Sequence, residues 1–381
     1  YKGKIIWHNA SYDIKVLIYQ LWMDHIGDQD GLLKGLEVMT RHFDCTRVIT
    51  YLATNNCAGN KLGLKDIAHE FAGNWAEEDV NDIRKIPEDK LLEYNLVDCL
   101  STWFAYEKHY PTMVADQQET IHDDIFIPSL IDIIQMELTG MCMSREKVLY
   151  AEQVMLADKS NHIKELYSLA EIRDFEKYLK TEQILIDNAK LKNKVRTLDD
   201  PMIERIKFNP SSNNQLQQLL YEYLGYDVID RTKEKQPAVG AKTIKKLRHV
   251  AKSEDHVKMF DALIGLAEVN IILNNFIAAF KQARFNPQDG MHYLFGNFNL
   301  GGTVSGRLSS SGPNLQNIPS GGNKYAKIIK MCFMAPPGWI MVGADFASLE
   351  DRISALTTKD PMKLKVYTDG YDGHSLRAFN Y

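Results

Sequence analysis

The sequence is poor in the features that mark metal-binding, disulfide-rich or membrane proteins. Its 381 residues include only five cysteines, which are widely separated and form no Cys-x-x-Cys pair, so neither a zinc site nor a disulfide framework is predicted. No run of eighteen apolar residues is present, which argues against a membrane-spanning segment. No charged-then-apolar leader occurs at the N-terminus, and secretion is not indicated. We therefore expect a cytosolic protein with reduced thiols.

The composition is that of a globular protein, with charge placed unevenly along the chain. A hydrophobic share of 45% and a charged share of 25% predict about two or three domains with proper cores. The net charge of −5 is not that of a simple nucleic-acid binder. Residues 231–252, however, contain eight Lys or Arg residues and a single acid, Glu234. Such a stretch is either a phosphate-contacting surface or a solvated lysine-rich helix face.

A short apolar run at 339–344 ends on an acidic residue. It follows Pro-Pro-Gly, precedes Asp345 and a helix-like stretch, and is predicted to be a buried strand. A carboxylate at the exposed end of such a strand can hold Mg²⁺ against a phosphate. An Asp at this place can equally be a helix N-cap or turn residue.

Three motifs in the last third of the chain occur together. They are Thr-Val-Ser-Gly-Arg-Leu-Ser-Ser at 303–310, Pro-Asn-Leu-Gln-Asn-Ile-Pro at 313–319 and Asp-x-x-x-x-Glu-x-Arg at 345–352. In order and spacing they resemble the palm of family A DNA polymerases, which include bacterial DNA polymerase I and many phage replicative enzymes. The resemblance implies a DNA-directed DNA polymerase, a nucleotidyltransferase of DNA replication. Its expected partners are primer-template DNA and deoxynucleoside triphosphates, its cofactor is Mg²⁺ at two ions per active site, and its expected location is the cytoplasm of a bacterium or of a phage-infected host.

The resemblance also assigns roles around the acidic motif. Asp345 would coordinate both Mg²⁺ ions, assisted by the backbone carbonyl of Phe346. Glu350 would lie beside the sugar C2′ of the nucleotide and exclude ribonucleotides. His374, in Asp-Gly-His at 372–374, would donate to a nucleotide phosphate. Asp351 stands where the family has an apolar residue.

Polar residues of the two preceding motifs are expected to contact DNA. By the resemblance, Arg307 reaches the minor groove at the primer terminus, where shared acceptor positions allow a donor to check pair geometry rather than sequence. Gln316 and Asn317 would lie beside the template-primer.

The middle of the chain resembles the thumb of the same family. Phe-Asn-Pro-Ser-Ser-Asn at 208–213 is followed by Leu-Leu at 219–220 and Gly-Tyr at 225–226. The basic stretch falls at the thumb tip, which grips duplex DNA, so phosphate contact becomes the favoured interpretation. The candidates, none assigned singly, are Lys242, Lys245, Lys246 and Arg248. No processivity factor is identified.

The N-terminal third resembles part of the DnaQ-like 3′–5′ exonuclease fold. Asn-x-x-Tyr-Asp at 9–13 and Tyr-x-x-x-Asp at 94–98 are similar to the second and third motifs of that fold. By this resemblance Asp13 and Asp98 are metal ligands, Tyr94 positions a water, and Asn9 neighbours the cleaved strand. Taken singly, Asp13 is equally a helix N-cap residue and Tyr94 a half-buried surface residue.

These resemblances predict a multidomain chain of α+β and α/β class. We expect a partial RNase H-like exonuclease domain at 1–110, a connection at 111–145, a helical thumb at 146–290, and a partial antiparallel-sheet palm with the start of the fingers at 291–381. The exonuclease motif Asp-x-Glu that should precede the motif at 9–13, and the second catalytic carboxylate of the polymerase, are absent. Two-metal catalysis needs several carboxylates, so this 381-residue piece, which begins without Met, is expected to be inactive alone. The alternatives are an exonuclease-only protein and a non-catalytic DNA-binding half of a split polymerase.

Overall fold

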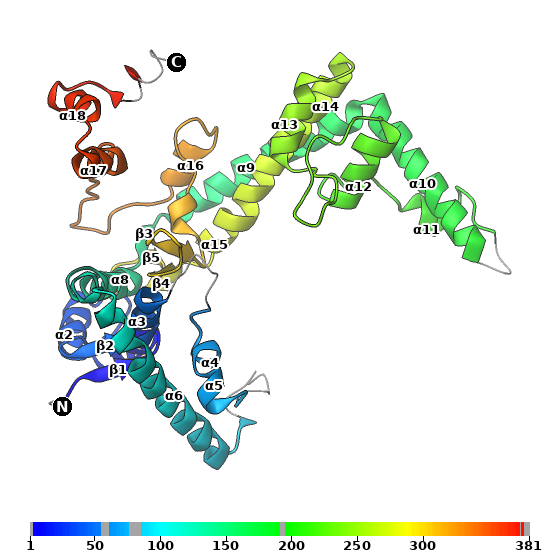
Figure 1. The fold of residues 1–381 in the computed structure, drawn as a ribbon. Coiled ribbons are helices and arrows are strands. Elements are labelled where there is room, and N and C mark those ends of the chain that lie inside the picture. Colours follow the sequence, from blue (N-terminus) through cyan, green and yellow to red (C-terminus); the bar gives the residue numbers. More distant parts are fainter. Residues whose placement is uncertain (1–2, 55–60, 76–84, 191–194, 374, 377–381) are drawn as a thin grey trace. The chain divides into compact units, whose positions relative to one another are not determined.

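The computed structural model describes residues 3–54, 61–75, 85–190, 195–373 and 375–376. The chain divides into two compact units, Tyr1–Met334 and Ala335–Tyr381, and Figure 1 labels most of their helices and strands.

The first unit opens with a small α/β arrangement. Strand β1 (Ile5–Trp7) pairs in parallel with β2 (Phe43–Cys45). A parallel pair needs a crossover connection, which α1 (Ala10–Leu21) and α2 (Gln29–Met39) provide. The apolar run at residues 4–8 predicts a strand from sequence alone, and β1 with the helix that follows it agrees with that pattern. The next elements are α3 (Thr46–Ala53), α4 (Leu64–Ile67), α5 (His69–Ala72), α6 (Glu88–Ala115), α7 (Glu119–Ile121), η3 (His122–Phe126) and α8 (Ile127–Thr139).

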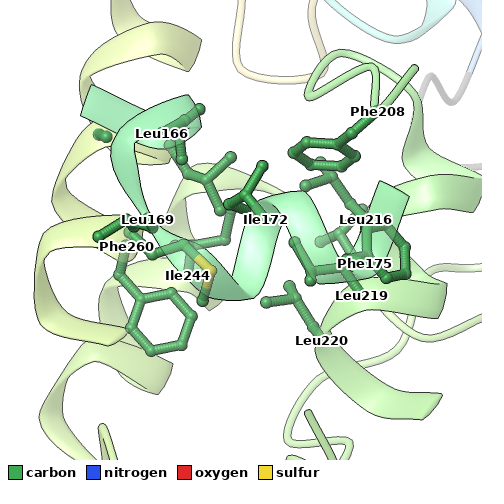
Figure 2. Close-up of a cluster of buried hydrophobic side chains, with 14 of the residues drawn as sticks. Leu166, Leu169, Ile172, Phe175, Phe208, Leu216, Leu219, Leu220, Ile244 and Phe260 are labelled. Atoms are coloured by element: carbon green, nitrogen blue, oxygen red, sulfur yellow. The ribbon is translucent and has the colours of Figure 1, made fainter. Parts of the chain in front are cut away.

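The middle of the first unit is helical, as predicted. Helix α9 (Arg145–Ser168) packs along α14 (Glu254–Ile271), and the two lie side by side in Figure 1. Between them the chain forms α10 (Ala170–Lys190), α11 (Pro201–Glu204), α12 (Asn213–Gln217), η4 (Gln218–Tyr223) and α13 (Ala241–His249). Figure 2 shows their shared core, in which Phe175, Leu219 and Phe260 are fully buried.

Helix α14 continues through η5 (Ile272–Ile277) into α15 (Ala278–Phe280). By length and composition alone, the continuous helix Glu254–Phe280 could cross a membrane. That test is also passed by core helices of soluble proteins. Here Phe260 and Leu263 belong to the core of Figure 2, and Val269 and Phe276 belong to a second cluster of buried residues.

Short antiparallel strands flank the helical region, β3 before it and β4 to β7 after it, and confirm the predicted antiparallel pairing. Strands β3 (Met141–Met143), β5 (Met291–Leu294) and β4 (Arg284–Asn286) form one sheet in that order. Strand β6 (Asn297–Asn299) pairs with β7 (Ser309–Ser311). Two short helices, η6 (Leu315–Asn317) and α16 (Ala326–Lys330), complete the first unit. The mixed helical and small-sheet content confirms the coarse fold class; the RNase H-like assignment and the four domain boundaries stay predictions.

The second unit contradicts one prediction. Residues 339–344 form no strand, and Trp339 and Val342 are 62% and 77% exposed. A strand is stabilised only by a hydrogen-bonded neighbour, and no described strand pairs with this run. The prediction of a buried strand at 339–344 is therefore wrong, because an apolar composition does not supply the hydrogen-bonding partner that a strand needs. The unit's helices are α17 (Leu349–Thr358) and α18 (Pro361–Thr368).

Candidate nucleic-acid interface and metal site

The predicted DNA-contacting residues Gln316 and Asn317 lie together on η6. A polar network fixes this turn, because the Gln316 amide donates to Asn314 Oδ1 at 3.2 Å and to Ser310 Oγ at 3.3 Å. Ser310 in turn donates to Asn314 Oδ1 at 2.9 Å. Ser310 of one motif and Asn314 of the next therefore hydrogen-bond to each other and to the backbone of the turn. The side chains of Gln316 and Asn317 are exposed.

Asn317 borders a cavity of about 830 Å³ between the end of the long helix and the β6–β7 hairpin. The cavity is rich in amide side chains, including Asn274 and Asn275 of η5, and it also contains Arg284 of β4. Amide and guanidinium groups suit the acceptor edges of the minor groove. The sequence analysis missed these three residues. The signal was an Asn pair inside an otherwise apolar helix, at a π-helical turn of the kind often found at functional sites.

Arg307 lies in an exposed loop anchored to the N-terminal helices. Thr303 Oγ1 donates to the Arg307 carbonyl at 2.7 Å, and Tyr51 of α3 donates to the Thr303 carbonyl at 2.9 Å. Gly301, with φ +71°, lies where an added Cβ would be 2.9 Å from the Tyr51 ring. Only glycine fits both that conformation and that contact.

Three of the four candidate thumb cations already have carboxylate partners. Lys245 is 3.1 Å from Glu268, Lys246 is 2.7 Å from Asp230, and Arg248 Nη2 donates to Asp261 at 2.9 Å. Lys242 is exposed on the same helix, α13. Exposed ion pairs contribute only about 0–1 kcal/mol, so these cations can exchange a carboxylate for a phosphate.

We expect the replacement Lys245→Ala/Lys246→Ala to weaken the salt dependence of duplex binding. Each lost phosphate contact lowers the slope of log K against log salt by about 0.9. The measurement is primer-template affinity of the 381-residue chain at several salt concentrations. A matched control is Lys108→Ala/Lys177→Ala, which also removes two ion-paired lysines. Equal slopes for the two variants would show that the basic stretch is only a solvated face.

The predicted exonuclease residues lie on two helices. Asn9 precedes α1 and accepts a hydrogen bond from Arg47 at 2.9 Å. Asp13 is half-buried in α1, and burial raises the pKa of its carboxyl. Tyr94 and Asp98 lie on α6, where Lys65 is 5.6 Å from the Tyr94 ring and Trp75 donates to Asp98 at 2.9 Å.

These residues do not form a complete metal site. Among the residues that the structure describes, no three His, Cys, Asp or Glu side chains are grouped to hold a metal ion. The two carboxylates are of the right chemical kind for Mg²⁺, but two-metal cleavage needs more of them. The proximity of Asp13 and Asp98 stays a prediction.

The predicted polymerase metal ligand lies in the second unit. Asp345, Phe346 and Glu350 are all exposed, and Ser348 between them has a left-handed backbone with φ 52°. A carboxylate and a backbone carbonyl are hard oxygen donors that fit Mg²⁺. One carboxylate is too few for a two-metal site. His374 lies outside the described residues.

Comparison with known proteins gives a consistent result. The family model of DNA polymerase family A matches residues 181–380. A DNA polymerase of Bacillus phage SP01 is 27% identical over 99% of this chain and 40% of its own length. DNA polymerase I of Synechocystis sp. is 26% identical over 97% of this chain and 32% of its own. The chain thus spans well under half the length of these relatives.

A solved structure shares the fold. The POL domain of Pol1 from M. smegmatis, in complex with DNA primer-template and dNTP, superposes with a TM-score of 0.62 at 17% identity. The match covers 87% of this chain and 48% of the other.

Proposed function

Because this chain belongs to DNA polymerase family A, we propose that it is part of a DNA-directed DNA polymerase that extends a primer on a DNA template. The observation that carries the proposal is the family match over residues 181–380, which includes all three palm motifs. The proposed substrates are deoxynucleoside triphosphates, and the proposed location is the cytoplasm of a bacterium or phage-infected host.

Divalent metal ions are general in this family, and Mg²⁺ is the proposed ion. When bound, the ions would neutralise charge on the attacking and leaving oxygens. Asp345 and the Phe346 carbonyl would hold them. Arg307, Gln316 and Asn317 would contact the primer-template, with the thumb cations on its phosphates.

A 3′–5′ proofreading exonuclease in the N-terminal third is part of the proposal. It is supported by the two sequence motifs and by the parallel β1–β2 pair beside α1 and α6. The alternative of a non-catalytic, DNA-binding half of a split polymerase has the same support from the thumb and palm motifs.

Primer extension separates these candidates. The longest natural polypeptide that contains this sequence should extend a primer with deoxynucleotides and Mg²⁺, and it should degrade an unpaired 3′ end when nucleotides are withheld. Duplex binding without extension would favour the non-catalytic alternative.

Glu350→Ala is expected to admit ribonucleotides. Removal of the side chain proposed to crowd the sugar C2′ should raise ribonucleotide incorporation relative to deoxynucleotide by about tenfold, since one lost discriminating contact is worth about 1–3 kcal/mol. Steady-state kcat/KM for a ribonucleotide and its deoxy counterpart is the measurement. Glu350→Asp, which shortens the side chain but keeps the acid, should fall between wild type and Ala. An unchanged ratio would remove Glu350 from nucleotide selection.

A further inference from the structure

A polar cluster joins the two helices of the second unit. Asp351, in the first turn of α17, has its Oδ1 3.0 Å from Nζ of Lys363 in α18. The Tyr367 hydroxyl donates to Asp351 Oδ2. Lys363 also donates to Ser354 Oγ at 2.8 Å. The side chains of Asp351 and Lys363 are 24% and 36% exposed, so the pair is partly shielded from solvent.

The first turn of α17 has no side-chain cap. Its N-cap residue, Ser348, is left-handed and makes no side-chain capping bond. In helix α18 the Asp360 side chain accepts from the amides of Met362 and Lys363. The ion pair from Lys363 therefore ties the uncapped first turn of α17 to a capped helix, as does Arg352 of α17, whose guanidinium lies 4.6 Å from the centre of the Tyr367 ring.

The cluster also touches the segment that precedes His374. A Cβ added at Gly373 would lie 3.8 Å from the Tyr367 hydroxyl and 3.9 Å from Asp351 Oδ2. Glu350, the neighbour of Asp351, shares with Gly373, Lys363 and Tyr367 the wall of one cavity of about 570 Å³. The cluster, Glu350 and Gly373 therefore border the same space.

We propose that Asp351, Lys363 and Tyr367 are positioning residues for nucleotide selection. They hold the Glu350 turn at a fixed distance from the segment at 372–373. Glu350 can then discriminate at the nucleotide sugar while the nucleotide phosphates lie next to that segment. The inference rests on the proposed polymerase function. The proposal also explains how an acid is accommodated at position 351. Lys363 is its ion-pair partner, and Tyr367 is its hydrogen-bond donor.

The test uses the longest natural polypeptide containing this sequence and measures kcat/KM for a deoxynucleotide and its ribonucleotide. Lys363→Ala should lower the deoxynucleotide value by about tenfold, because small displacements of positioning groups have large kinetic effects. The ribonucleotide value should fall less, so that discrimination decreases. Lys363→Arg keeps the ion pair and should restore discrimination. The matched control is Lys365→Ala, which removes an exposed lysine two residues along the same helix.

A double variant of Asp351 and Lys363 gives a second measurement. Asp351→Leu/Lys363→Leu replaces the ion pair by an apolar contact and should lower kcat/KM for the deoxynucleotide less than Lys363→Ala does. The double variant also provides a test if Lys363→Ala does not fold. Equal effects of Lys363→Ala and Lys365→Ala would overturn the proposal. An equal fall of both kcat/KM values would also overturn it and leave Lys363 a purely structural role. Failure of the wild-type polypeptide to extend a primer would instead refute the proposed function.

Discussion

Asp345→Ala is expected to reduce primer extension by the full-length polypeptide at least about a thousandfold, since the carboxylate is the proposed ligand of both ions and charge stabilisation is the main catalytic term in phosphoryl transfer. Duplex affinity should stay within about twofold, because a metal ligand acts on the ions and not on the DNA phosphates along the thumb. Single-turnover extension and a separate binding titration measure the two effects.

An acid of the same unit provides the control. Asp369 is exposed beyond the end of α18, and Asp369→Ala should extend primers as wild type does. Extension by Asp345→Ala at the wild-type rate would show that the metal is held elsewhere. The isolated 381-residue chain should give no extension with Mg²⁺ and all four deoxynucleotides, because one carboxylate cannot hold two ions.

Local patterns in the sequence predicted most of the helices. At 88–107 the apolar residues recur at helical spacing, which predicts a helix, and α6 runs from Glu88 to Ala115. The Asn and Ser residues at 209–213 are typical of a helix start, and Ser212 accepts a hydrogen bond from the Gln215 backbone amide. These features depend on residues within one or two turns of each other, so a single sequence contains the information.

Features that depend on distant partners could not be predicted. The run at 339–344 has the composition of a strand but no described neighbour to pair with. For the helix at 254–271, the 3-4-3-4 spacing of apolar residues predicts one buried stripe made of Val257, Phe260, Ile264, Ala267 and Ile271. Ile271 is 51% exposed, whereas Met259, Leu263 and Leu266 are buried. The helix is apolar on more than one side, so the packing of α9 and α13 decides which side is buried.

The candidate site also combines local features, which the sequence predicts, with features that depend on distant partners. The motif alone predicts Gln316 and Asn317 as DNA contacts, which stays a prediction, and the structure shows that Ser310 and Asn314 fix their turn by hydrogen bonds. The carboxylate partners of Lys245, Lys246 and Arg248 were invisible, because Glu268, Asp230 and Asp261 lie 13 to 23 positions away. Any phosphate that binds at these cations has to compete with internal acids.

Glu137→Ala is expected to be the most destabilising of the changes considered, at about 3–5 kcal/mol of unfolding free energy, as for other broken buried ion pairs. Glu137 of α8 is 6% exposed. Its carboxylate pairs with Lys15 of α1 and accepts from the Phe298 amide of β6 at 2.5 Å. One side chain thus joins the N-terminal helices to the β6–β7 hairpin. Urea denaturation of the 381-residue chain is the measurement.

The two partners of Glu137 can be separated. Glu137→Gln keeps an acceptor for the Phe298 amide and loses the charge, so it should lose less stability than Ala. Lys15→Met/Glu137→Met removes both charges and should recover part of the loss, leaving about 1–3 kcal/mol for the unpaired amide. Asp132→Ala, on the exposed side of α8, should change stability by less than about 0.5 kcal/mol. If Glu137→Ala lowered the free energy of unfolding no more than Asp132→Ala does, the buried carboxylate would contribute nothing to joining these elements. Apolar packing alone would then hold α8 against α1 and β6.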